Sequence, residues 1–130
     1  MKKHIVAIGG GGFARKNSSF LIEQYILNLS AKICPKVCFL ATATGDSDSY
    51  IVRFYSVFTR LNCIPTHIEF FKRTTNIKNH IMEQDVVFVG GGNTKSMLAI
   101  WNEWGMSQLL KVAYNKGVIM SGVSAGAICW

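Results

Sequence analysis

The chain has 130 residues, of which 49% are hydrophobic and 16% charged, and its formal net charge is +7. This balance excludes a disordered chain, and the length predicts one domain over residues 1–130 with little room for a second. The lysines and arginines are scattered singly or in pairs, which indicates a solvated surface. We therefore expect no nucleic-acid partner, although attraction for an anionic substrate stays open.

A strand is expected at residues 4–8, where a short apolar run ends at four consecutive glycines. A helix is expected to begin at Ser18 or Ser19, because either hydroxyl could cap it. The spacing of apolar residues predicts that its buried face consists of Leu21, Ile22, Tyr25, Ile26 and Leu29.

The next strand is predicted at residues 37–41, where Pro35 precedes an apolar run. A polar loop at 42–49 follows, and Asp46 and Asp48 are candidate caps for the helix after it. That helix is expected over residues 50–61, with an apolar face of Ile51, Phe54, Val57, Phe58 and Leu61.

Strands and helices continue to alternate through the rest of the chain. The strand predicted at 85–89 is uniformly apolar after its aspartate, as expected where helices cover both faces of a sheet. The complete pattern predicts an α/β protein with a doubly wound, mostly parallel sheet. The remaining expected elements are strands at 66–71 and 117–122, helices at 77–82, 94–104 and 107–115, and a helix starting at Ala125.

The cysteines and the chain start bear on metal binding and location. Cys34 and Cys38 are spaced C-x-x-x-C, without the second pair or nearby histidine that a zinc site needs, so no metal is expected. Cys38 lies in an apolar run and is typical of a small buried residue. We see no signal peptide and no membrane-spanning stretch, and therefore expect a reduced, cytoplasmic protein with no membrane partner.

The strongest chemical signal is G-x-S-x-G at residues 122–126, where a predicted strand meets a helix start. A serine on such a turn projects its hydroxyl above the sheet, and flanking glycines let the two backbones approach. The N–H of Ala125 would then face the oxygen that becomes negative during acyl transfer. The pattern favours Ser124 as a nucleophile, although turns also accept glycine and serine for structural reasons alone.

A second signal, Gly-Gly-Gly-Asn-Thr at residues 90–94, also follows a predicted strand. Ligands of open α/β sheets bind outside the carboxyl ends of strands. Consecutive glycine N–H groups form an anion-binding concavity, and one of them could supply a second oxyanion donor. A turn in which Asn93 or Thr94 caps the next helix explains the same residues structurally.

The glycines at residues 9–12 also fit a dinucleotide-binding loop, since Gly9 to Ala14 reads G-x-G-x-x-A. That loop requires an acidic residue at the end of the second strand, whereas the first acid after residues 41–43 is Asp46. Nucleotide binding is therefore the weaker interpretation.

Together these stretches resemble the peptidase E family of serine peptidases, which includes cyanophycinases and is similar in fold to class I glutamine amidotransferases. The resemblance rests on the first glycine-rich turn and on residues 87–94 and 121–130, and it covers nearly the whole chain. It implies a three-layer α/β fold, flavodoxin-like or glutamine amidotransferase-like. This chain would be the N-terminal part of that fold, truncated at its C-terminus.

The resemblance also implies roles for individual residues. Ser124 would be the nucleophile, with an oxyanion hole formed by the N–H of Ala125 and one N–H of the Gly91–Gly92 turn. Asn93, followed by Thr94, would lie at the substrate cleft. The substrates would be small peptides, in several members cleaved at an aspartyl residue, and no metal or organic cofactor would be needed.

The chain departs from this family in its general base. A serine needs an adjacent base, and the family's histidine and acidic partner would lie beyond the last residue of this chain. His4 and His67 are predicted at the N-terminal ends of strands and His80 on a surface helix, so none is expected to serve. A fragment, a frameshifted product, or a piece completed by another polypeptide would each explain the departure. Besides a small peptide substrate, the expected partners are a complementing C-terminal fragment or another copy of this chain in a homo-oligomer.

Three functional hypotheses remain open at this point. The first is a serine-type peptidase or its amino-terminal portion. The second is an inactive relic or binding module that keeps the cleft without the base. The third is a nucleotide-binding α/β domain that uses residues 9–14.

Overall fold

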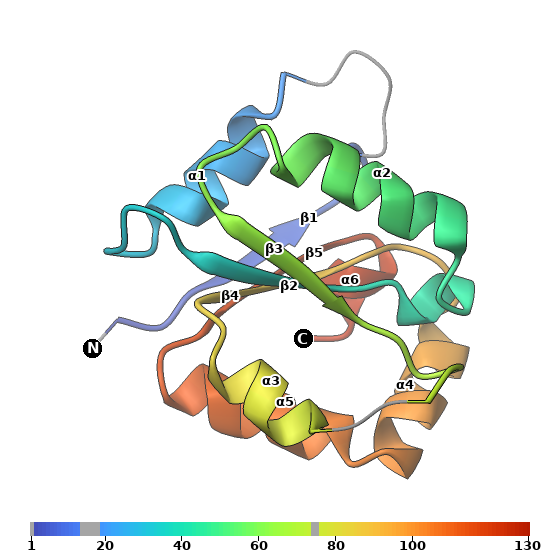
Figure 1. The fold of residues 1–130 in the computed structure, drawn as a ribbon. Helices are drawn as coiled ribbons and strands as arrows, with labels where there is room; N and C mark the ends of the chain where they lie inside the picture. The colour runs from blue at the N-terminus through green and yellow to red at the C-terminus, as the bar shows by residue number, and fades with distance from the viewer. Residues whose placement is uncertain (1, 14–18, 74–75) are drawn as a thin grey trace.

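Five parallel strands form one sheet in the order β1-β5-β4-β2-β3 (Figure 1). The computed structural model describes residues 2–13, 19–73 and 76–130. The strands are β1 (Ile5–Ile8), β2 (Lys36–Leu40), β3 (Ile64–Ile68), β4 (Val86–Val89) and β5 (Ile119–Val123). The helices are α1 (Leu21–Asn28), α2 (Asp48–Phe58), α3 (Ile77–Met82), α4 (Thr94–Glu103), α5 (Met106–Asn115) and α6 (Ala125–Ile128), with a 3-10 turn η1 (Thr42–Thr44).

The α/β class and the alternation of elements are confirmed, and the sheet is parallel in all of its pairings. β1 lies at an edge beside β5, whereas a flavodoxin-like sheet places its first strand inside. Helices α1 and α2 lie on one side of the sheet, and α3, α4 and α5 lie on the other (Figure 1). This double winding leaves the carboxyl ends of β4 and β5 side by side.

Two apolar clusters fill the spaces between the sheet and its helices. The cluster under α1 and α2 is rich in phenylalanine, and the rings of Phe39 and Phe54 stack with centroids 4.7 Å apart. The cluster on the opposite face contains Trp101 and Met106. Cys38 is fully buried in the sheet, as predicted, and burial raises the pKa of its thiol to about 12. No helix among residues 2–13, 19–73 and 76–130 is long and apolar enough to cross a membrane.

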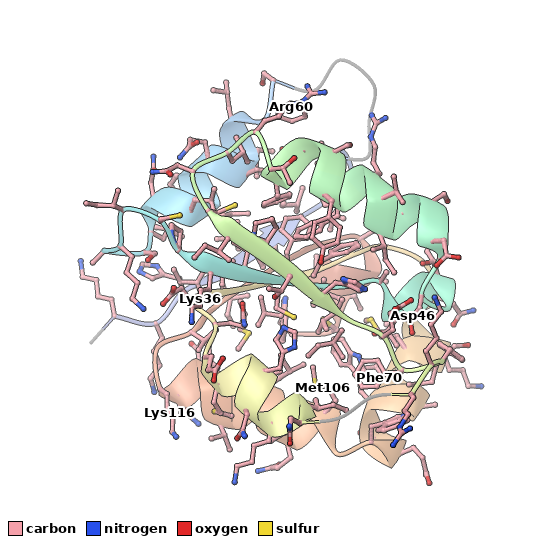
Figure 2. The ribbon with its side chains drawn as sticks, viewed as in Figure 1. Lys36, Asp46, Arg60, Phe70, Met106 and Lys116 are labelled. Atoms are coloured by element: carbon pink, nitrogen blue, oxygen red, sulfur yellow. The ribbon has the colours of Figure 1, made fainter. Side chains whose placement is uncertain are left out.

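The predicted boundaries of the third strand were wrong. β3 occupies Ile64–Ile68 instead of 66–71, because the N–H groups of Phe70 and Phe71 donate to the carboxylate of Asp46 and leave the ladder with β2. Asp46 and Phe70 are labelled in Figure 2. Asp46 is therefore not a helix cap, and α2 begins at Asp48 after Ser47.

The prediction for α1 was also wrong in two respects. The helix begins at Leu21 after Phe20, Ser19 does not cap it, and Ser18 lies outside the described residues. Ile26 and Leu27 are buried as part of the core, but Leu21 and Tyr25 are 72% and 57% exposed. The apolar positions cover more of the helix surface than one sheet can bury, so spacing alone did not identify the buried side.

Candidate active site

Ser124 connects β5 to α6 in a backbone conformation that L-residues rarely adopt, with φ 56° and ψ −110°. Its N–H donates to the carbonyl of Ile8 at 2.9 Å, and its carbonyl accepts the N–H groups of Ala127 and Ile128 at 2.8 and 3.0 Å. These bonds fix the turn from both sides. The side chain is exposed to solvent, in agreement with the predicted elbow.

The two glycines of the motif allow this turn by close backbone contact. A Cβ at Gly122 would overlap the carbonyl of Gly126, and a Cβ at Gly126 would overlap the carbonyl of Val89. Alanine at either position would therefore separate α6 from the strands beneath it. The motif is required to hold Ser124 above the ends of β4 and β5.

The triple-glycine turn after β4 lies directly beside Ser124. A Cβ at Gly91 would lie 3.4 Å from the Cβ of Ser124 and 3.9 Å from its Oγ. Gly92 has φ 141°, and a Cβ there would overlap the carbonyl of Ala43. The fold thus brings together two glycine motifs that lie more than thirty residues apart in the sequence.

Backbone N–H groups in this region differ in whether they are already bonded. The N–H of Gly91 donates to the Tyr50 hydroxyl at 3.2 Å, and that of Asn93 donates to the carbonyl of Ala43 at 2.8 Å. Within the described part of the chain, the N–H of Gly92 has no such partner. Ala125 is the first residue of α6, so its N–H has no acceptor inside the helix. Among the described residues, the N–H groups of Gly92 and Ala125 are therefore candidate donors for a ligand at this turn.

Asn93 caps the next helix, which is the structural alternative that the sequence left open. Its Oδ1 accepts the N–H of Ser96 at 2.9 Å and caps α4, whose first residue is Thr94. Asn93 is exposed beside the glycine turn, and the capping bond uses its amide oxygen and not its amide nitrogen. A role in substrate binding stays a prediction for both residues.

Tyr50 is the residue that sequence reasoning missed. Its ring occupies the space where a Cβ at Gly90 would lie, with ring atoms 2.6 to 2.9 Å from that position. Burial raises the pKa of its phenol, and the hydrogen bond from Gly91 acts in the opposite direction. In the sequence Tyr50 is only the first apolar residue of a helix, so no local signal indicates this contact.

The three histidines lie away from Ser124. His4 precedes β1, and its carbonyl pairs with Met120 at the start of β5. His67 lies near the carboxyl end of β3 rather than its beginning, so that prediction was wrong, but β2 and β4 still separate it from β5. His80 Nε2 lies 3.0 Å from Thr66 Oγ1, and burial lowers the pKa of the imidazole.

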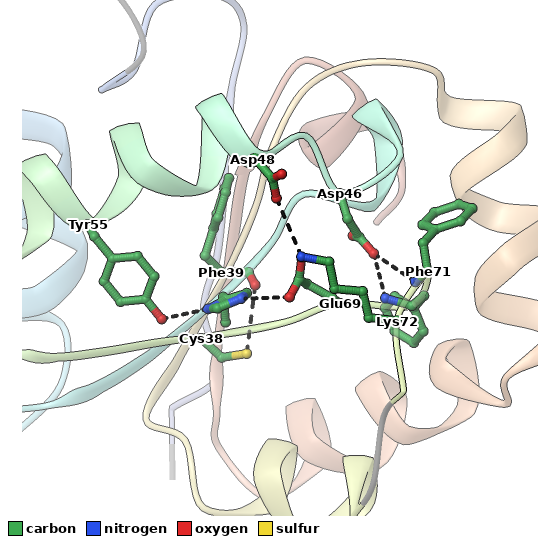
Figure 3. A network of polar contacts seen from close by, with 10 residues as sticks. Cys38, Phe39, Asp46, Asp48, Tyr55, Glu69, Phe71 and Lys72 are labelled. Carbon is green, nitrogen blue, oxygen red and sulfur yellow. Dashed lines mark hydrogen bonds and ion pairs between the residues drawn. The ribbon is translucent and has the colours of Figure 1, made fainter.

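His67 belongs to the polar network that contains Tyr55 and Glu69, both labelled in Figure 3. Its Nδ1 lies 2.6 Å from the Tyr55 hydroxyl and its Nε2 lies 3.3 Å from Glu69. Lys72 continues the network to Glu69 and Asp48 at 3.4 and 3.7 Å. Both ring nitrogens of His67 are thus engaged on the β3 side of the sheet. No group of His, Cys, Asp and Glu among the described residues is suited to hold a metal ion.

The structure is thus an α/β protein with an all-parallel sheet, and it carries an exposed serine on a strained turn beside a glycine turn. Residues 5–130 match the profile of peptidase family S51, and the chain belongs to that family. It is 48% identical over 129 residues to the uncharacterized peptidase YgaJ of Bacillus subtilis (strain 168).

Two crystal structures have similar folds. One is of a protein from Listeria monocytogenes EGD-e, provisionally described as a peptidase E protein, with a TM-score of 0.72 and 20% identity over 97% of this chain. The other is of a peptidase from an acI-B1 Actinobacterium, with a TM-score of 0.72 and 19% identity over 95% of this chain. This chain spans 56% of YgaJ and 60% and 54% of the two crystallised chains, in each case less than two thirds.

Proposed function

We propose that this chain is the nucleophile-bearing part of a serine-type peptidase that hydrolyses small peptides. The observation that carries the proposal is the position of Ser124, exposed on a strained turn with Gly91 beside its Oγ. Strained backbone at a solvent-exposed nucleophile is typical of functional sites. Cleavage at aspartyl residues is the substrate preference that the family resemblance suggests.

In the proposed reaction, Ser124 Oγ attacks the carbonyl carbon of the scissile peptide bond. The carbonyl oxygen becomes negative and accepts hydrogen bonds from the N–H groups of Ala125 and Gly92, for which the described residues provide no acceptor. The serine proton passes to a base and then to the leaving amine, which departs and leaves an ester on Ser124. Water hydrolyses that ester and restores the hydroxyl.

The base of this reaction has to come from another polypeptide segment. His67 and His80 are bonded on the β3 side of the sheet, and His4 lies at the opposite end of the strands from Ser124. Without a base the oxyanion donors and binding contribute only a small part of the full acceleration. We therefore expect weak or absent turnover by residues 1–130 alone.

A binding module without catalysis is the second candidate, because the glycine turn and the helix cap at Asn93 form without any base. The nucleotide-binding interpretation has less support. Its phosphate would sit on a helix that opens directly after the loop, and the first helix among the described residues, α1, begins at Leu21. Phe13 of that loop is buried in the core, and Ala14 lies outside the described residues.

A fluorophosphonate probe tests the proposal on the chain co-expressed with the C-terminal part of YgaJ that lies outside the match. We expect one label, lost in Ser124→Ala and retained in Ser56→Ala, an exposed serine on α2. Labelling that survives Ser124→Ala would refute the assigned nucleophile. A stable complex that takes no label would favour the binding module.

A further inference from the structure

The outer edge of β1 presents free backbone groups. The carbonyls of His4 and Ile8 accept the N–H groups of Met120 and Ser124 in β5, at 3.0 and 2.9 Å. Because alternate residues of a strand bond to opposite sides, the N–H and C=O groups of Ile5 and Ala7 point away from β5. Within the described residues no strand lies on that side.

The opposite edge of the sheet is protected and β1 is not. In β3 the N–H of Ile64 donates toward β2, to the carbonyl of Pro35 at 2.9 Å, so the next residue faces outward. That residue is Pro65, which has no N–H and prevents another strand from pairing there. β1 has the sequence Ile-Val-Ala-Ile, without a charge or a proline. The contrast indicates that the edge of β1 is suited to pair with another strand.

An apolar groove opens beside the same edge, on the face that carries α4, α5 and α6. It has a volume of about 230 Å³ and is lined mainly by Ile5, Leu98, Trp101, Leu110, Met120 and Trp130. Ile5 is 46% exposed, although its neighbour across the ladder, Met120, is buried. The indole nitrogen of Trp130 is buried without an acceptor among the described residues. The groove therefore has room for apolar side chains from another segment, and the Trp130 indole has room for an acceptor from the same segment.

The comparisons indicate what occupies this surface. YgaJ shares 48% identity with nearly all of this chain, yet the match covers only 56% of YgaJ, and the chain corresponds to the N-terminal part of its relatives. The rest of YgaJ is long enough to supply a strand and a packing helix. A second copy of this chain is a poorer occupant, because each copy carries a net charge of +7.

We propose that the edge of β1 and the adjoining groove bind a polypeptide equivalent to the C-terminal part of YgaJ. This partner adds a strand next to Ile5 and Ala7, places apolar side chains in the groove, and offers an acceptor to Trp130. The surface lies next to the β5–α6 turn, since Ile8 of the same strand bonds to Ser124. Binding here would bring a partner's side chains toward the serine.

The test measures binding and not catalysis, so it can fail independently of the peptidase proposal. The full chain is co-expressed with the C-terminal part of YgaJ, and the complex is isolated by size-exclusion chromatography and its affinity measured. We expect a one-to-one complex. Ala7→Pro removes an outward N–H without touching the β5 ladder and should weaken the complex at least tenfold, whereas Ala7→Ser keeps the N–H and should not.

A second variant covers the case in which Ala7→Pro fails to fold. Ile5→Lys places a charge in the groove from an exposed position and should also weaken the complex at least tenfold, with an unchanged circular dichroism spectrum. Absence of a complex with the unmodified chain would overturn the proposal. So would a complex insensitive to both variants, or a homodimer of the chain alone that Ala7→Pro dissociates.

Discussion

The N–H of Gly91 donates to the hydroxyl of Tyr50, and the same tyrosine ring fills the space above the α-carbon of Gly90. One side chain of α2 thus fixes the turn that follows β4, from the opposite layer of the molecule. This glycine turn also lies against Ser124. The position of the proposed oxyanion donors therefore depends on a residue that does not belong to either glycine motif.

Replacing Tyr50 with phenylalanine should reveal this dependence. The ring stays in place, but the half-buried N–H of Gly91 loses its acceptor, so we expect the free energy of unfolding to fall by about 1 kcal/mol. Urea denaturation measures the change. Tyr25→Phe, on an exposed tyrosine of α1, is the control and should be neutral. Equal effects of the two variants would argue against a structural role for the Tyr50 hydroxyl.

Strain at Ser124 predicts an unusual order of stability among its variants. Glycine adopts the observed backbone angles without steric cost, whereas alanine retains the strain of about 1–3 kcal/mol. Ser124→Gly should therefore be more stable than Ser124→Ala by at least about 1 kcal/mol, while both lose fluorophosphonate labelling. Thermal and urea unfolding of the two variants provide the comparison, and equal stabilities would show that the turn is unstrained.

Gly126 should tolerate no larger side chain. A Cβ there would overlap the carbonyl of Val89, which is backbone and cannot move aside, so Gly126→Ala should destabilise the chain by about 1–3 kcal/mol or more. Gly9 has no atom within 4 Å of its would-be Cβ, and Gly9→Ala should change stability by less than about 0.5 kcal/mol. Soluble yield and unfolding midpoints would distinguish the two, and similar values would contradict the packing argument.

Glu23 should make the chain less stable as the pH rises. Its side chain is buried in α1, its carboxylate oxygens have no partner among the described residues, and desolvation raises its pKa from the ordinary 4.5. The folded protein therefore holds the proton more tightly than the unfolded chain. The resulting penalty is absent below about pH 4.5, grows as the pH rises toward the folded pKa, and is complete above it.

Glu23→Gln removes the ionisable group and should be more stable than the unmodified protein near neutral pH, with a flatter dependence of unfolding free energy on pH. Glu103→Gln, on an exposed glutamate of α4, is the matched control and should leave that dependence unchanged. Identical pH profiles for Glu23→Gln and the unmodified protein would mean that a cation balances this carboxylate.

Much of this fold could be predicted from local sequence, because its elements are short and strongly marked. The all-apolar stretch before Gly90 predicted β4, and the helix over residues 77–82 was placed without error. The geometry of Ser124 also followed from its motif, since only a tight turn explains glycines two residues on either side. The catalytic roles of Ser124, Ala125, Gly91, Gly92, Asn93 and Thr94 stay predictions.

The errors share a physical cause, which is competition from residues far away in the sequence. Asp46 accepts the N–H groups of Phe70 and Phe71, which therefore do not pair with β2. No local pattern predicts a carboxylate that bonds to main chain twenty-four residues away. The buried side of α1 depends on where the sheet lies, so Leu21 and Tyr25 were assigned to the core incorrectly. The hydrogen bond between Gly91 and Tyr50 could not be predicted from the sequence for the same reason.

The pairing of β1 with β5 also constrains how the chain acquires its structure. Ile5 pairs with Met120, and β1 has no other neighbour among the described strands, so β1, the first of these strands, pairs only with the last of them. Closing so long a loop is slow, and interactions of this kind delay folding relative to local ones. During synthesis β2, β3 and β4 can assemble before β5 is made, and the serine turn, which bonds to Ile8, can form only when β5 reaches β1.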